Sequence, residues 1–174
     1  MRRSVANNLN DIAKDHPEVV ADIAARWMKG ASPERKRLIR HACRTLIKKG
    51  HPKTLAVFGF KPPRMAQAKI DLLTSKVIFG ESLQFTFTVC SNSDRDQTLV
   101  IDYVIHHQKA NGSMSPKVFK WRTITLQGKE TLTLTKNHPI RKVTTRVYYP
   151  GLHRVEVMVN GISAGAADFE LSMP

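Results

Sequence analysis

Apolar residues recur with two different periods along the 174-residue chain. Up to about residue 60 they recur every three or four positions, the spacing of one face of an α-helix. From residue 67 they alternate with polar residues, the spacing of a strand with one buried face. The change of period predicts an α+β chain of two domains. We place helical repeats at 1–60, a proline-rich linker at 61–66 and a β-domain at 67–174.

Residues that stop helices divide the first part into four segments. Proline disfavours helix in the residue before it, so His16-Pro17 and His51-Pro52 mark boundaries. Gly30 is a plausible stop, and Ser32 followed by proline and an acid is a start signal. The predicted helices cover 2–15, 17–29, 33–49 and 52–58.

The two His-Pro pairs stand 35 residues apart, each after a basic amphipathic helix and before an apolar one. Helix, turn and helix at such a period is typical of an α-solenoid. Two repeats are too few to be stable alone. We therefore interpret them as the last repeats of an array whose beginning is missing, and the first helix indeed has no cap ahead of it.

The β-domain is predicted from about seven short strands separated by turn residues. Residues 83–89 and 131–135 alternate cleanly, and Asn160-Gly161 between two apolar runs is a strong hairpin signal. Short strands with regular turns over roughly 105 residues indicate an immunoglobulin-like β-sandwich. The predicted fold is thus a short α-solenoid followed by such a sandwich.

The charge balance is strongly positive. The chain has 28 Lys and Arg against 14 Asp and Glu, a net charge of +14. This favours a polyanion such as nucleic acid as partner, and the alternative is a merely basic soluble protein. Cys43 and Cys90 have no metal-like spacing, and the adjacent His106 and His107 point to opposite faces of a strand. We expect two reduced thiols, no metal, no cofactor and no membrane span.

Two basic segments are candidates for phosphate contact. One stripe follows the third helix at spacings of three or four, without an acid after Glu34: Arg37, Arg40, His41, Arg44 and Lys48. The other is the connection 136–146 of the sandwich, which we expect at one of its ends. Its candidate residues are Lys136, Asn137, Arg141, Lys142 and Arg146. Such side chains contact DNA phosphates or the minor groove, and plain solvation is the alternative for each.

The first helix carries the candidate carboxylate. Its apolar stripe is predicted to be Val5, Ala6, Leu9, Ile12 and Ala13. The opposite stripe holds Arg3, Ser4, Asn7 and Asp11, with Asn10 at its edge. Asn, Ser and Asp are weak helix formers, so something other than helix stability favours them here. A carboxylate can stabilise the sugar cation formed when a glycosidic bond breaks. A structural hydrogen bond or salt bridge of Asp11 is the alternative.

Several stretches resemble one family closely. They are RRSVANNLNDIAKDHP at 2–17, RHACRTLIKKGHP at 40–52, VIDYVIHH at 100–107, KVFKW at 117–121 and YYPGLHRVEV from 148. They are similar to the HEAT-like-repeat DNA alkylation repair glycosylases of the AlkC type, whose C-terminal domain is immunoglobulin-like. The resemblance covers nearly the whole chain.

The resemblance implies a DNA glycosylase, a hydrolase that excises N3-alkylated cationic bases such as 3-methyladenine without flipping them. It implies alkylated double-stranded DNA as partner, a cytoplasmic, nucleoid-associated location, and Asp11 as the stabilising carboxylate. We expect Arg3 and Asn7 to contact DNA beside it. Family members carry further repeats before this point, so a non-catalytic DNA-binding fragment is the alternative. A third interpretation is a sandwich edge that binds another protein, and the oligomeric state is not predicted.

Overall fold

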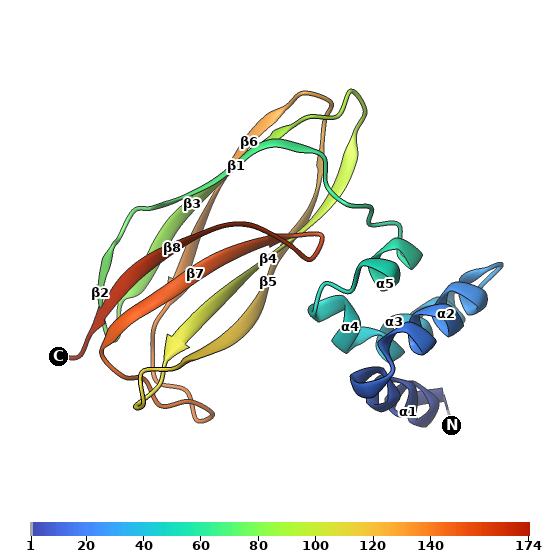
Figure 1. Cartoon of the computed structure of the whole chain (residues 1–174), viewed down its shortest axis with the longest axis horizontal. Coiled ribbons are helices and arrows are strands. Elements are labelled where there is room, and N and C mark those ends of the chain that lie inside the picture. The colour runs from blue at the N-terminus through green and yellow to red at the C-terminus, as the bar shows by residue number, and fades with distance from the viewer. Residues whose placement is uncertain (1) are drawn as a thin grey trace. The chain divides into compact units, whose positions relative to one another are not determined.

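The computed structural model describes residues 2–174. The chain divides into two compact units, a helical unit that ends at Pro62 and a β-sandwich that begins at Pro63. Within the described residues the helical unit has five helices, labelled in Figure 1. They are α1 (Arg2–Asp15), α2 (Pro17–Met28), α3 (Pro33–Ala42), α4 (Arg44–Lys48) and α5 (Pro52–Val57). The structure is therefore mixed α+β, as predicted.

The helix predicted at 33–49 is wrong in one respect, because it is broken at Cys43 into α3 and α4. The backbone N–H of Thr45 donates to Asn10 Oδ1 of α1 at 3.2 Å. The carbonyl of His41, four residues before Thr45, accepts from the Arg44 guanidinium at 2.8 Å. In an unbroken helix the Thr45 N–H would donate to the His41 carbonyl. Here the Asn10 side chain of α1 and the Arg44 side chain take the place of that hydrogen bond.

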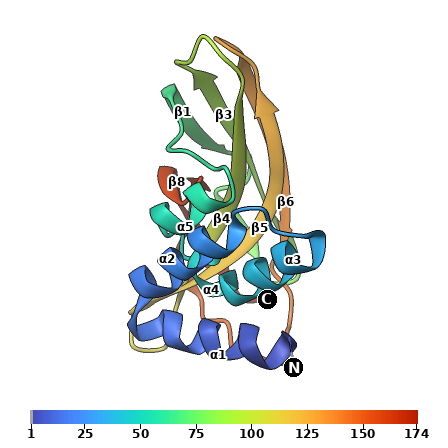
Figure 2. The same cartoon turned by 90° about the vertical axis from the view of Figure 1, so that its right-hand side faces the viewer.

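The buried face of α1 also differs from the predicted stripe. Ala6, Leu9 and Ala13 are buried as expected, but Val5 and Ile12 are 39% and 37% exposed. Asn10, expected on the polar side, is only 4% exposed. The packed face is rotated because the neighbouring helices approach α1 along Ala6 and Asn10, where small and hydrogen-bonded side chains allow close contact. Figure 2 shows the helical unit from the side, with α1 running along its lower edge.

The sandwich consists of two sheets. The described strands are β1 (Met65–Leu72), β2 (Lys76–Ile78), β3 (Ser82–Ser91), β4 (Gln97–Gln108), β5 (Met114–Leu126), β6 (Thr131–Pro139), β7 (Gly151–Val159) and β8 (Ile162–Ser172). One sheet has the order β1-β3-β6 and the other β2-β8-β7-β4-β5. β2, which pairs in parallel with β8, was not predicted. The Asn160-Gly161 turn does join β7 to β8 as expected, with φ of 46° and 78°.

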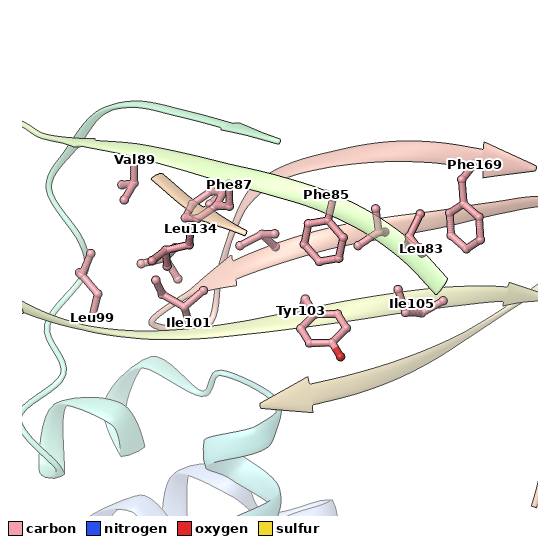
Figure 3. Close-up of a cluster of buried hydrophobic side chains, with 14 of the residues drawn as sticks. Leu83, Phe85, Phe87, Val89, Leu99, Ile101, Tyr103, Ile105, Leu134 and Phe169 are labelled. Atoms are coloured by element: carbon pink, nitrogen blue, oxygen red, sulfur yellow. The ribbon is translucent and has the colours of Figure 1, made fainter. Parts of the chain in front are cut away.

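The core lies between the two sheets. In β3 the fully buried Leu83, Phe85, Phe87 and Val89 alternate with polar residues. Figure 3 shows these side chains facing those of Leu99, Ile101, Tyr103 and Ile105 on β4. Complete burial of one such side chain contributes ~1.5–3 kcal/mol. The period-two pattern read from the sequence is therefore the inner face of the sandwich.

Candidate nucleic-acid interface

Asp11 lies on the exposed side of α1. Its Oδ1 accepts from Lys14 Nζ at 2.8 Å, and its side chain is 65% exposed. The Lys14 hydrogen bond and charge lower the pKa of the Asp11 carboxyl, with a smaller contribution from the Arg44 charge. The carboxylate is therefore ionised at neutral pH and open to an approaching cation.

Two asparagines of α1 hold the helix to its neighbours. Asn7 Oδ1 lies 3.2 Å from His41 Nε2 of α3, where an imidazole N–H can donate to the amide carbonyl. Asn10 accepts from the Thr45 backbone. These contacts give a structural reason for residues with weak helix propensity. They also bring Asp11 and the basic residues of α3 and α4 onto one part of the helical unit.

The basic stripe of the third helical segment is exposed. Arg37, Arg40, Arg44 and Lys48 all face solvent across the break at Cys43. The Arg40 guanidinium carbon lies 5.6 Å from the centre of the Phe58 ring, a cation–π contact that orients it. The stripe is therefore a solvent-facing positive surface.

A shallow groove of about 400 Å³ extends this surface to α1. Its lining brings together Arg3 of α1 and Arg37 of α3, which are far apart in the sequence. Glu34 also lines the groove. The first turn of α3 therefore adds one acidic group to a mainly basic face.

The basic segment of the sandwich is only partly a connection, contrary to expectation. Lys136 and Asn137 belong to β6, which extends to Pro139. Lys136 is half-buried with its ammonium 5.4 Å from the centre of the Tyr103 ring, whereas Asn137 is exposed opposite Gln84 of β3. β6 continues through residues 136–139 because these four residues pair with β3. In the sequence they do not continue the alternation of apolar and polar residues.

The connection itself covers 140–150, and Arg141 and Lys142 are exposed on it. Arg146 is half-buried, and its Nη1 has no hydrogen-bond partner within the described residues. The predicted DNA-contacting residues of the sandwich therefore have three different environments. Of these residues, only Asn137, Arg141 and Lys142 are exposed.

Sequence reasoning missed a group of buried polar rings near this connection. His138 Nδ1 lies 2.9 Å from the Tyr103 hydroxyl, and both residues are buried. His107 and His153 are also buried, with ring centres 5.7 Å apart. Strand alternation from Leu132 to His138 was the available signal for an inward-pointing histidine.

Other site types have no support in the described part of the chain. Residues 2–174 contain no group of three or more His, Cys, Asp or Glu side chains placed to hold a metal ion. No described helix combines the length and apolarity required to cross a bilayer. Both cysteines are free thiols.

Comparison with protein families identifies the sandwich. Residues 66–173 match the family described as "Uncharacterised protein YhaZ, C-terminal Ig-like domain". The chain belongs to the YhaZ family. The immunoglobulin-like assignment of the second domain is thereby confirmed.

Individual relatives extend the YhaZ likeness to the helices. The chain is 38% identical to the uncharacterized protein YhaZ of Bacillus subtilis over 172 residues, 98% of this chain and 47% of that protein. A solved structure of Pseudomonas fluorescens alkylpurine DNA glycosylase AlkC, bound to DNA containing an abasic site analog, is 37% identical with a TM-score of 0.83. It covers 98% of this chain and 48% of AlkC. The resemblance to the C-terminal portion of an AlkC-type protein is confirmed, and the chain spans about half the length of these relatives.

A more distant likeness concerns the fold alone. A β-glucosidase from Listeria innocua is 22% identical over 67% of this chain and 17% of its own, with a TM-score of 0.53. At that identity the match indicates a shared architecture and carries no activity to this YhaZ-family chain.

Proposed function

We propose that the chain acts in the repair of alkylated DNA, as the C-terminal part of an AlkC-like glycosylase. The substrate would be duplex DNA with an N3-alkylated, cationic base such as 3-methyladenine. The observation that carries this proposal is the similarity to DNA-bound AlkC over 98% of the chain. Such a protein would be found in the cytoplasm with the nucleoid.

The chemistry assigned to Asp11 is electrostatic. Breaking the bond between base and sugar leaves positive charge on the sugar, and a nearby carboxylate stabilises it. Asp11 is ionised, and its partner Lys14 is itself 59% exposed. Because exposed ion pairs contribute little, Asp11 can exchange Lys14 for a sugar cation at small cost.

Basic residues on both units would bind the phosphates of the DNA. On the helical unit these are Arg3, Arg37, Arg40, Arg44 and Lys48, and on the sandwich Arg141 and Lys142, together with the half-buried Arg146. Asn7 would add a polar contact next to Asp11, and Asn137 and Lys136 would contribute from β6. Each Lys or Arg that neutralises a phosphate releases counterions, so affinity should fall with salt.

The helical unit would belong to a HEAT-like array. Its exposed apolar residues support this, because Val5 and Ile12 of α1 and Val19 and Trp27 of α2 are all at least 37% exposed. In a longer protein a neighbouring helix pair would cover these side chains.

The deciding experiment measures base release from duplex DNA containing 3-methyladenine. The wild-type chain is compared with Asp11→Asn and with Asp22→Asn, an equal charge change on α2. The proposal predicts release by wild type and Asp22→Asn and at least tenfold less by Asp11→Asn. Equal release by both variants would remove Asp11 from the mechanism.

The alternative function is a non-catalytic DNA-binding module. It is favoured by the solvent-facing basic stripe, which needs no chemistry. It predicts no base release, but duplex binding that weakens steeply between low and moderate salt and weakens further in Arg40→Glu and Arg44→Glu. Affinity independent of salt would contradict both functions.

A further inference from the structure

A pocket of about 410 Å³ lies in the sandwich beneath the 140–150 connection. Part of its lining is formed by aromatic rings from four places in the chain. The Phe119 and His138 ring centres are 4.7 Å apart, and those of His107 and Tyr148 are 5.3 Å apart. Two of these rings, His107 and His138, belong to the group of buried polar rings described above, and Phe119 and Tyr148 are half-buried beside them. A volume of this size is within the usual range for small-ligand sites.

Three cationic side chains line the same pocket: Lys117 of β5, and Arg141 and Arg146 of the connection. None of the described lining residues is acidic. A solvated surface usually carries charges of both signs. A concave site lined only by positive charges raises the local concentration of anions. The pocket is therefore suited to a negatively charged ligand.

Two buried nitrogen atoms of the lining have no partner in the described structure. They are Nδ1 of His107, a residue only 4% exposed, and Nη1 of Arg146. A buried polar atom without a hydrogen bond is costly, and native proteins seldom leave one unpaired. Because a guanidinium N–H can only donate, the missing partner of Arg146 must be an acceptor.

His107, Thr145 and Arg146 also line an adjoining hollow of about 560 Å³. The two unpaired nitrogens thus belong to side chains that border both spaces. A ligand entering from either hollow would reach the same pair of residues.

We propose that this pocket binds an oxyanion of the phosphate class, with Arg146 as its principal donor and His107 as the buried second contact. The phosphate would come either from a free phosphate or phosphomonoester or from the backbone of a nucleic acid. The inference does not rest on the proposed repair function, which also assigns Arg146 to a DNA phosphate, because it is argued from the lining of the pocket alone.

The test follows Arg146 Nε–H and His107 ring signals by NMR in the full ¹⁵N-labelled chain. The probes are inorganic phosphate, deoxyadenosine monophosphate, and a short duplex without terminal phosphates. We expect saturable shifts of both signals with inorganic phosphate. Arg146→Gln should weaken binding about tenfold or more, as expected for loss of a charge-assisted hydrogen bond. Arg95→Gln, an equal charge change in the β3–β4 connection, should bind like wild type.

His107→Phe keeps a ring but removes both nitrogens, and should also weaken binding. If this core variant does not fold, the site is still tested by Arg146→Gln. Shifts with phosphate and the mononucleotide alone assign a phosphomonoester site, and shifts with the duplex as well assign a backbone phosphate. No saturable shift with any probe, or equal binding by Arg146→Gln, overturns the proposal.

The two proposals fail separately. Duplex binding measured by fluorescence anisotropy, with no shift of the Arg146 signal for any of the three probes, would refute the pocket and leave the repair function standing. Phosphate binding in the pocket without base release or duplex binding would refute the repair function alone.

Discussion

His138 should make the sandwich sensitive to mild acid. Its ring is buried between the sheets, with the Tyr103 hydroxyl at 2.9 Å and the Phe119 ring at 4.7 Å. Burial lowers the pKa of His138 from 6.5 to about 4, with a further contribution from the positive charge of Lys136. The folded sandwich therefore keeps this imidazole neutral at pH values where the unfolded chain protonates it.

The sign and size follow from proton linkage. Between pH 6.5 and about 4 the unfolded state binds one more proton than the folded state at His138, so the free energy of unfolding falls as pH falls. Each pH step of one is worth ~1.4 kcal/mol, which gives a loss of roughly 3 kcal/mol across the whole window. The contribution of neutral His138 to the free energy of unfolding is fully present above pH 6.5. Burial also lowers the pKa of His153, which adds to the loss in the same direction.

The assay is urea unfolding across this pH window, followed by the fluorescence of Trp121, which contacts Phe85 in the sandwich core. The chain has two tryptophans, so a Trp27→Phe background makes the signal specific for the sandwich. His138→Gln can still accept from Tyr103 but has no titrating ring, and it should lose most of the pH dependence in this window. His16→Gln, an exposed change in the helical unit, should retain it. An unchanged slope in His138→Gln would refute the reasoning.

Three further predictions concern the helical unit. Asn10→Ala removes the acceptor of the Thr45 N–H and should lower the free energy of unfolding by about 1–3 kcal/mol, measured by urea unfolding with circular dichroism; a neutral effect would mean that water replaces the amide. Ser32→Ala removes the cap of α3, whose hydroxyl accepts from the Arg35 N–H at 3.3 Å, and should cost about 1 kcal/mol in the same assay, whereas Ser32→Gly should cost only a few tenths. Burial raises the pKa of the Cys43 thiol to about 11, so at neutral pH a disulfide reagent should modify Cys43 much more slowly than Cys90, and Cys43→Ser should remove only the slow phase.

Local signals were sufficient for most elements. Pro17, Ser32-Pro33 and Pro52 begin helices where predicted, since capping and proline geometry act within one turn. Alternation in β3 and the turn at Asn160-Gly161 likewise depend on neighbouring residues. The break at Cys43 could not be predicted in this way, because its cause is an asparagine on another helix.

The candidate site was predictable only in part. Asp11 and the basic stripe were found because charge and helical spacing are visible in the sequence, and their roles stay predictions. The groove that joins Arg3 to Arg37 depends on how α1 packs against α3. Lys136 was assigned to a connection because the pattern of β6 beyond Thr135 is polar, and pairing with β3 extends the strand.

By itself, the sequence determined the two-part α+β order, the starts of α2, α3 and α5, the positive charge and the family resemblance. These follow from periodicity, capping residues and composition, which are properties of short stretches or of the whole chain. Only the tertiary structure decided that Asn10 and His138 are buried, and that His107 and Arg146 share a pocket. The physical reason is that each of these side chains depends on partners distant in the sequence, and burial of a polar group is set by those partners.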